Sequence, residues 1–253
     1  MKTIQLRNVT IGSGAPKVII PIVATTEEEI ILKAKELKQL PLDVVEWRAD
    51  FFEDVFHLDK VLGVLHSLRA VLGEKPILFT FRTKKEGGEK EISIAEYTAL
   101  NKLAARSGCA DAVDVEIFSG DAVVRENIEN IHNAGVIVVG SNHDFDRTPD
   151  KDDLLYRLRK MQDMGADIPK LAVMPKSRAD VLMLLNATEE MYSKYADRPI
   201  ITMSMSALGG ISRICGEVFG SSMTFGSVGQ VSAPGQIPAD QLNSVLEIIH
   251  QSL

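Results

Sequence analysis

The amino-acid sequence predicts an α/β protein of the (β/α)8 class, the TIM barrel. Strand-like apolar runs alternate with segments of helical periodicity along the whole chain. The starts of successive runs are roughly 25 to 35 residues apart, which is the length of one βα unit. Eight such units fit a chain of 253 residues, and polar side chains stand at the ends of several runs.

The main alternative is an open, doubly wound parallel sheet. In that fold a glycine-rich nucleotide-binding turn commonly follows the first strand, and no such turn follows Val18–Val23. The chain has no linker, low-complexity tract or change of composition that would divide it. We therefore prefer the barrel and expect a single domain over residues 1–253.

The elements are predicted in chain order. Residues 3–13 alternate apolar and polar side chains around Arg7 and Asn8, which indicates a hairpin that we expect to close the bottom of the barrel. The predicted strands are Val18–Val23, Val44–Arg48, Ile77–Arg82, Ala112–Glu116, Val136–Ser141, Lys170–Met174, Ile200–Met203 and Thr224–Gly226. The predicted helices are Glu27–Leu40, Val55–Leu72, Ile94–Ser107, Val123–Ala134, Leu154–Met164, Arg178–Tyr195, Gly210–Phe219 and Gln241–Gln251.

Composition narrows the class of protein. Hydrophobic residues make up 45% of the chain and charged residues 25%, as in ordinary globular proteins. The net charge of −7 argues against binding to nucleic acid or to an anionic membrane. The longest apolar run, Val18–Ala24, is too short to cross a bilayer, and residues 1–10 lack the apolar core of a secretory signal. We expect a cytoplasmic protein that acts on a small molecule.

Several cofactor motifs are missing from the sequence. Cys109 and Cys215 form neither a CxxC pair nor a disulfide framework. No HxH or HExxH pattern is present, and neither GxGxxG nor a P-loop occurs. We therefore expect no metal and no nucleotide cofactor.

His143 follows the predicted strand Val136–Ser141, flanked by Asn142 and Asp144. In a barrel, residues beyond the carboxyl ends of the strands form the catalytic face, so His143 is a candidate acid–base group. The other interpretation is an ordinary loop histidine. The remaining histidines lie on or beside predicted helices and fit that description: His57, His66, His132 and His250.

Lys170 begins the next predicted strand, Lys170–Met174. A lysine amine that is desolvated inside a barrel is held neutral more easily, and a neutral amine can attack a ketone to form a Schiff base. A first-residue position puts Lys170 low in the barrel, however, and only a side chain pointing up the interior would reach the loops. The alternative is a lysine that extends outward to solvent. Strand position leaves both interpretations open.

Charged residues recur near the ends of three further strands. Glu46 and Arg48 share one face of Val44–Arg48 because side chains alternate along a strand. Arg82 ends the next strand and Glu86 follows in the loop, and Ala112–Glu116 contributes Asp114 and Glu116. One such end is a solvated rim, whereas several together favour a polar pocket, because buried charges persist when they are paired or functional.

Two loops complete the candidate site. Residues 209–213 (Gly-Gly-Ile-Ser-Arg) follow the seventh strand and would hold a phosphate on backbone N–H groups, or a carboxylate on Arg213, or form a plain turn. Residues 226–238 are rich in glycine and small residues, as in a lid from which Ser232 and Gln236 would reach a substrate. A simple linker to the last helix is the alternative.

In combination these segments resemble the type I 3-dehydroquinate dehydratases (3-dehydroquinases) of the shikimate pathway. The likeness covers nearly the whole chain, and its motifs are specific only as a set. They are Glu46-Trp47-Arg48-Ala49-Asp50, Phe79-Thr80-Phe81-Arg82 with Glu86-Gly87-Gly88, Ser141-Asn142-His143-Asp144-Phe145, Lys170 with Met174-Pro175, Ile201-Thr202-Met203-Ser204-Met205, Ser212-Arg213 and Ser232-Ala233-Pro234-Gly235-Gln236.

The resemblance implies a (β/α)8 barrel, usually dimeric, that needs no cofactor and dehydrates 3-dehydroquinate to 3-dehydroshikimate by syn elimination. Lys170 matches the lysine that forms a Schiff base with the substrate ketone, His143 matches the general acid–base group, and Glu86 matches the carboxylate that orients it. The matched substrate-binding positions are Glu46, Trp47, Arg48, Arg82, Arg213, Ser232 and Gln236, with Arg213 on the substrate carboxylate.

One position departs from the family pattern. Pro21 stands where some members have a serine on the first strand, and proline supplies neither a hydroxyl nor an N–H group. Two other functions remain as alternatives: a class I aldolase-like barrel that uses the same lysine imine, and a catalytically silent barrel that binds carboxylated metabolites. Biosynthesis of shikimate and catabolism of quinate would use identical chemistry.

Overall fold

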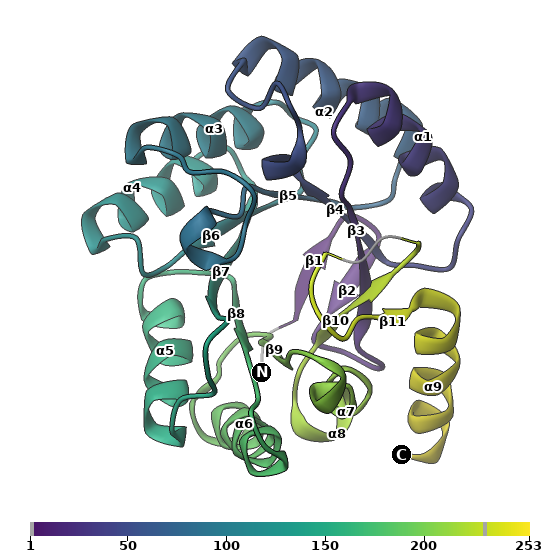
Figure 1. Cartoon of the computed structure of the whole chain (residues 1–253), viewed down its shortest axis with the longest axis vertical. Helices are drawn as coiled ribbons and strands as arrows, with labels where there is room; N and C mark the ends of the chain where they lie inside the picture. Colours follow the sequence, from purple (N-terminus) through teal and green to yellow (C-terminus); the bar gives the residue numbers. More distant parts are fainter. Residues whose placement is uncertain (1–2, 230–231) are drawn as a thin grey trace.

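The computed structural model describes residues 3–229 and 232–253, and its parallel strands curl into a barrel with helices on the outside (Figure 1). The strands pair in the order β11-β10-β3-β4-β5-β6-β7-β8-β9. Their bounds are β3 Lys17–Ile22, β4 Val44–Arg48, β5 Ile77–Thr80, β6 Ala112–Glu116, β7 Ile137–Asp144, β8 Ile168–Val173, β9 Ile201–Ser204, β10 Met223–Ser227 and β11 Ile237–Pro238. The helices are α1 Glu27–Lys38, α2 Leu58–Leu72, α3 Ile94–Arg106, α4 Asp121–His132, α5 Lys151–Asp163, α6 Arg178–Glu190, α7 Ile211–Ile214, α8 Gly216–Phe219 and α9 Ala239–Ser252.

The barrel closes between β9 and β10. These two strands form no continuous ladder and meet at an isolated bridge between Ile200 and Ser221. The Ser222 N–H donates to the Ile200 carbonyl at 2.8 Å, and the Ser221 hydroxyl accepts from the Thr202 N–H at 3.0 Å. The predicted (β/α)8 fold is therefore confirmed.

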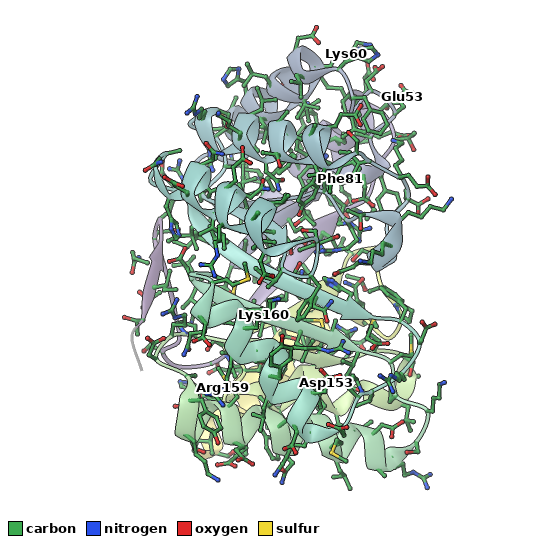
Figure 2. All side chains as sticks on the ribbon, turned by 90° about the vertical axis from the view of Figure 1, so that its left-hand side faces the viewer. Glu53, Lys60, Phe81, Asp153, Arg159 and Lys160 are labelled. Carbon is green, nitrogen blue, oxygen red and sulfur yellow. The ribbon has the colours of Figure 1, made fainter. Side chains whose placement is uncertain are left out.

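Side chains alternate between two layers along each strand. On β4, Val44 packs in the apolar cluster inside the barrel, while Val45 and Trp47 belong to the larger cluster between the strands and the helices. Phe81 is buried in that outer cluster, whereas charged residues such as Arg159 lie at the surface of α5 (Figure 2). This alternation decides which polar residues face the interior.

A two-stranded hairpin, β1 Ile4–Leu6 and β2 Val9–Ile11, lies at the amino-terminal end of the strands. Leu6 and Ile11 are buried against residues that point into the barrel near the amino-terminal ends of its strands, including Ile19 and Val44. The hairpin thus closes the bottom of the barrel, as the sequence predicts, and any ligand must enter from the other end.

Ile11→Ala is expected to lower the free energy of unfolding by about 2–5 kcal/mol, because Ile11 is fully buried beneath the barrel and its truncation leaves a cavity. Denaturant unfolding of the variant measures this loss. Thr10→Ala is the matched control, because Thr10 lies on the exposed face of the same strand. Equal stability of the two variants would show that the hairpin does not pack as described.

Some element boundaries differ from the prediction. β7 extends to Asp144, so His143 lies within the strand instead of beyond it, and β8 begins at Ile168 instead of Lys170. The predicted helix Gly210–Phe219 is interrupted at Cys215, which leaves the helical conformation (ψ 15°), and forms two short helices. Two of these differences move site residues relative to their strands.

Candidate active site

A cavity opens at the carboxyl ends of the barrel strands. Every predicted site residue except Trp47 lines it, and Phe145, Ala172, Met203, Met205 and Phe225 supply apolar wall. The polar lining residues are Glu46, Arg48, Arg82, Glu86, His143, Lys170, Arg213, Ser232 and Gln236. The strands therefore gather residues that are nearly 200 positions apart in the chain into one pocket.

Lys170 is the third residue of β8, and its side chain points into the barrel. Ile168 and Ala172, two residues to either side, pack in the interior cluster, which fixes the direction of Lys170. Its side chain is 4% exposed, with Nζ 3.3 Å from Asp114 Oδ2 and 3.8 Å from Glu46 Oε1. The low, first-residue position expected from the sequence was wrong.

Phe225 covers one side of the same amine. Lys170 Nζ lies 4.5 Å from the centre of the Phe225 ring, an arrangement in which the ring face attracts the cation. The amine is therefore held between carboxylates and an aromatic face, inside the cavity and away from bulk water.

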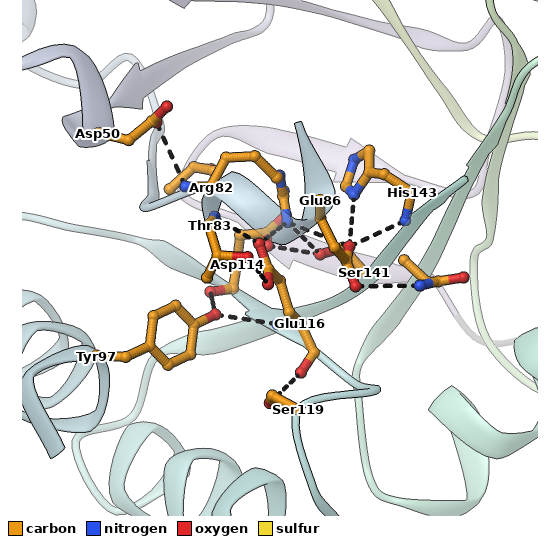
Figure 3. A network of polar contacts seen from close by, with 12 residues as sticks. Asp50, Arg82, Thr83, Glu86, Tyr97, Asp114, Glu116, Ser119, Ser141 and His143 are labelled. Atoms are coloured by element: carbon orange, nitrogen blue, oxygen red, sulfur yellow. Dashed lines mark hydrogen bonds and ion pairs between the residues drawn. The ribbon is translucent and has the colours of Figure 1, made fainter. Parts of the chain in front are cut away.

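His143 and Glu86 form a hydrogen-bonded pair in the same cavity. The Glu86 Oε2 atom accepts the backbone N–H of His143 at 2.9 Å and lies 3.0 Å from its ring Nδ1, while Asn142 Nδ2 donates to Glu86 Oε1 at 3.1 Å. With Nδ1 bonded to Glu86, the Nε2 atom is left for a ligand. Figure 3 shows the pair from close by.

Burial shifts the titration of both members. Burial and the charge of Glu116 raise the pKa of Glu86 to about 8, although Arg82 and Asn142 act in the opposite direction. Burial and the positive charges of Arg82, Lys170 and Arg48 lower the pKa of His143 well below its ordinary value. Burial therefore disfavours the charged form of both groups.

Arg82 links the pair to β6. Its Nη2 donates to Asp114 Oδ2 at 2.7 Å, and its Nη1 donates to Glu116 Oε1 at 3.0 Å and to Ser141 Oγ at 2.9 Å (Figure 3). Although burial opposes ionisation, Arg82 and Lys170 lower the pKa of Asp114. The charges behind the cavity are thus paired, as buried charges must be.

Arg213 differs from the other buried cations. Its side chain is buried, and no carboxylate pairs with it among the described residues. The Nη2 group donates to the Pro234 carbonyl at 3.0 Å, Nη1 reaches the Phe225 carbonyl at 3.4 Å, and Nε has no partner in the described part of the chain. Burial lowers the pKa of Arg213 to about 10. A desolvated guanidinium of this kind favours an anionic ligand.

The segment after β10 lies over the cavity in residues 232–236; residues 230–231 of the predicted lid fall outside the described part of the chain. Ser232 N–H donates to Gln236 Oε1 at 2.8 Å, and Gln236 Nε2 donates to Ser232 Oγ at 3.0 Å. The Ser206 N–H donates to the Pro234 carbonyl at 3.1 Å and so ties the segment to the loop after β9. Arg213 holds the same carbonyl from inside the cavity.

Gly235→Ala is expected to weaken substrate binding and raise KM about 10-fold or more, because a 1 Å misplacement of binding groups is that costly. Gly235 has φ +80°, and a Cβ atom there would lie 2.1 Å from the Ser206 carbonyl oxygen, so the lid could not dock. Steady-state kinetics measure the effect. Gly229→Ala is the control: it has a similar φ of +71° but no backbone atom within 4 Å of its would-be Cβ. Equal kinetics in both variants would refute the docking argument.

Trp47 is the one predicted site residue that the structure does not bring to the cavity. It is fully buried on the outer face of β4, with its ring 5.5 Å from Phe79 and 6.1 Å from Phe52 between centres. Because side chains alternate along a strand, Glu46 and Arg48 cannot share a face with the residue between them. Its assignment to substrate binding is therefore corrected to a packing role.

Two further carboxylates support the site, Asp114, which the sequence placed in the polar pocket without a role, and Asp50, for which no role was predicted. Asp114 faces inward, beside Lys170, and Asp50 is fully buried and grips Arg48 with both oxygens at 2.8 Å. The alternation on β6 placed Asp114 on the same face as Glu116, and its position beside Lys170 agrees with the predicted polar pocket. Pro21 is buried on β3, level with Glu46 on β4.

The family model described as type I 3-dehydroquinase matches residues 18–253. The chain belongs to this family. A curated relative, the 3-dehydroquinate dehydratase of Clostridioides difficile strain 630, is 52% identical over 252 residues, covering 100% of this chain and 99% of its own. The corresponding protein of Syntrophotalea carbinolica is 52% identical over 250 residues, covering 99% of both chains.

The likeness to solved structures of 3-dehydroquinate dehydratases is equally complete. A crystal structure of the type I 3-dehydroquinate dehydratase from Clostridium difficile with covalently modified comenic acid has a TM-score of 0.98 at 52% identity, covering 100% of this chain and 99% of that one. The 3-dehydroquinate dehydratase of Geobacillus kaustophilus has a TM-score of 0.96 at 41% identity, covering 99% and 97%.

Residues 3–229 and 232–253 contain neither a membrane-spanning helix nor a metal-binding cluster. No helix in them is long and apolar enough to span a membrane. No group of three or more His, Cys, Asp or Glu side chains within the same ranges is arranged to hold a metal ion.

Proposed function

We propose that this cavity dehydrates 3-dehydroquinate to 3-dehydroshikimate through a Schiff base on Lys170, with His143 as general acid and base. The observation that carries the proposal is the buried Lys170 amine in the same cavity as the His143–Glu86 pair, in a chain of this family. An imine former beside an acid–base group is what a stepwise elimination next to a ketone requires.

In the first stage the Lys170 amine adds to the substrate ketone and forms a carbinolamine. The carbinolamine hydroxyl takes up a proton from solvent and leaves as water, which gives a protonated imine that draws electrons from the neighbouring carbon. Asp114 at 3.3 Å and Glu46 at 3.8 Å offset the positive charge at this nitrogen. The imine makes the adjacent C–H bond acidic enough for an imidazole to deprotonate.

In the second stage His143 Nε2 removes a proton from the carbon next to the imine, and the C–H electrons form an enamine. The imidazolium then protonates the departing hydroxyl on the same face, so water leaves and a conjugated imine forms. Glu86 holds the ring through Nδ1 in both steps. Hydrolysis of the imine releases the product and restores Lys170.

The remaining cavity residues bind the substrate. Arg213, a buried cation without a paired carboxylate among the described residues, suits the substrate carboxylate. Glu46, Arg48, Arg82, Ser232 and Gln236 suit its hydroxyl groups, the last two from the lid. The family resemblance further supports a single-domain homodimer that acts in the cytoplasm at the third step of aromatic amino-acid biosynthesis.

Borohydride trapping tests the proposal. The protein is incubated with 3-dehydroquinate, with and without borohydride, and mass spectrometry locates the reduced adduct. Attachment at Lys170, with dehydroshikimate absorbance rising in the untrapped sample, supports dehydration. Turnover of a sugar phosphate in place of 3-dehydroquinate would support the aldolase-like alternative. If neither an adduct nor turnover is detected, the catalytically silent binding protein is the interpretation that remains.

The value of kcat/KM is expected to rise with pH and to level off above about pH 8, because Glu86 has a raised pKa of about 8. Below that pKa the protonated Glu86 donates to Nδ1, and the ring proton then occupies Nε2, which cannot act as a base. In Glu86→Gln the titrating carboxyl is gone, and the acidic limb should move to lower pH, where His143 titrates alone. A kcat/KM that does not change with pH in the wild type would contradict this assignment of protons to Glu86 and His143.

A further inference from the structure

Glu116 on β6 has no part in the proposed reaction, yet both of its carboxylate oxygens accept hydrogen bonds. Its Oε1 accepts the Thr83 backbone N–H at 2.8 Å and Arg82 Nη1 at 3.0 Å, and its Oε2 accepts the Thr83 hydroxyl at 2.7 Å (Figure 3). The residue is 2% exposed. A buried carboxylate with three donors on it is a firm anchor.

Thr83 is the point at which the turn that carries Glu86 is attached. It precedes the 3₁₀ turn Lys84–Glu86, and its carbonyl accepts the N–H of Glu86 at 3.0 Å and of Gly88 at 2.9 Å. The turn is only three residues long, so a shift of Thr83 passes directly to the Glu86 backbone. Thr83 itself does not line the cavity.

The anchor is fixed from behind as well. The Glu116 N–H donates to the buried Tyr97 hydroxyl at 3.0 Å, and the Ser119 hydroxyl donates to the Glu116 carbonyl at 2.7 Å. Glu116 is therefore held at its backbone while it holds Thr83 with its carboxylate. These hydrogen bonds connect Tyr97 on α3 to Glu116 on β6, and Glu116 to Thr83. The turn after Thr83 ends at Glu86 in the cavity.

We infer that Glu116 is a positioning residue for the reaction: by anchoring Thr83 it fixes the turn that places Glu86, and through Glu86 it sets the His143 ring. The inference rests on the proposed function, because it assigns Glu116 to the steps in which His143 moves a proton. Glu116 touches neither the cavity nor Lys170, so imine formation does not depend on it.

The charge of Glu116 acts on the same pair. Arg82 lies between the two carboxylates, 3.0 Å from Glu116 and 3.9 Å from Glu86. Loss of the Glu116 charge would ease the ionisation of Glu86 and move the acidic limb of the rate profile to lower pH. The charged and titratable groups that face this region are Arg48, Arg82, Glu86, Tyr97, Asp114, His143 and Lys170.

Thr83→Val tests the positional part. Valine keeps the shape of threonine and removes the hydroxyl that binds Glu116 Oε2. We expect kcat to fall about 10- to 100-fold, while borohydride trapping at Lys170 proceeds at the wild-type rate. Thr188→Val is the control: it removes another buried hydroxyl, bonded to Leu184 and Thr202 in α6 and β9, and should leave kcat unchanged.

Two substitutions of Glu116 separate position from charge. Glu116→Asp keeps the charge but shortens the side chain away from Thr83, so kcat should fall as in Thr83→Val. In Glu116→Gln the amide oxygen accepts the Thr83 N–H and the amide nitrogen donates to the Thr83 hydroxyl. This variant should keep most of the wild-type kcat and shift its acidic limb to lower pH.

The outcomes distinguish the two proposals. Inactive wild-type protein would overturn the proposed function itself. Active wild type, with wild-type kcat in both Thr83→Val and Glu116→Asp, would overturn the positioning role alone. Loss of trapping in parallel with turnover would also overturn it, because that pattern describes general damage to the barrel. A lower kcat with intact trapping is the result that supports it.

Discussion

Lys170→Met is expected to abolish turnover, with a fall in kcat of at least about 10⁴-fold. Methionine fills a similar volume but has no amine, so the substrate ketone cannot become an imine and the neighbouring carbon stays a weak acid. The variant should give no borohydride adduct. Product absorbance measures turnover, and mass spectrometry measures the adduct.

Lys75→Met is the matched control. Lys75 Nζ donates to the carbonyls of Leu40 and Leu42 at 3.0 and 3.1 Å and lies outside the cavity. Its loss should cost stability without changing kcat. If Lys170→Met retained kcat within about tenfold of wild type, imine catalysis on this residue would be wrong.

His143→Ala is expected to lower kcat by about 10²–10⁴-fold, the range for loss of a general acid–base group. The upper part of that range is expected, because one ring serves both proton transfers. Lys170 still reacts with the ketone, so the imine should accumulate and trapping should become more complete than in the wild type. Rapid-quench trapping with borohydride measures the accumulation.

His132→Ala is the control for a lost histidine. His132 bonds Asp167 at 2.9 Å on the outside of the barrel and is partly exposed. Its kinetics should equal those of the wild type. Normal turnover in His143→Ala would remove His143 from the mechanism and return the search to the other groups of the cavity.

Periodicity was sufficient to predict the barrel and much of the site. Apolar runs of strand length recur between helical segments, and Glu46 and Arg48 share the inner face of β4 as the alternation requires. The same alternation would have excluded Trp47 from the substrate-binding residues. Trp47 was included because it stands between Glu46 and Arg48 in the family motif. The error came from transferring a motif as a block instead of residue by residue.

Other features depend on contacts that periodicity does not contain. The predicted strand began two residues too late, at Lys170 instead of Ile168. Pro169 lies inside β8, level with Gly140, although proline is typical of strand starts and edges. The His143–Glu86 bond joins residues 57 positions apart, and only the family resemblance suggested it. That no carboxylate of residues 3–229 and 232–253 lies beside Arg213 is likewise visible only in three dimensions.

The corrected position of Trp47 has a practical consequence. It is the single tryptophan of the chain, it is fully buried, and its indole nitrogen has no partner in the described residues. Its emission maximum should therefore lie at shorter wavelength in the folded protein and shift to longer wavelength on unfolding. Because Trp47 sits behind the strand that carries Glu46 and Arg48, a ligand in the cavity cannot touch it. A change in the Trp47 emission spectrum on adding substrate would therefore report a movement of β4. The fluorescence of Trp47 can thus be used to follow this wall of the cavity.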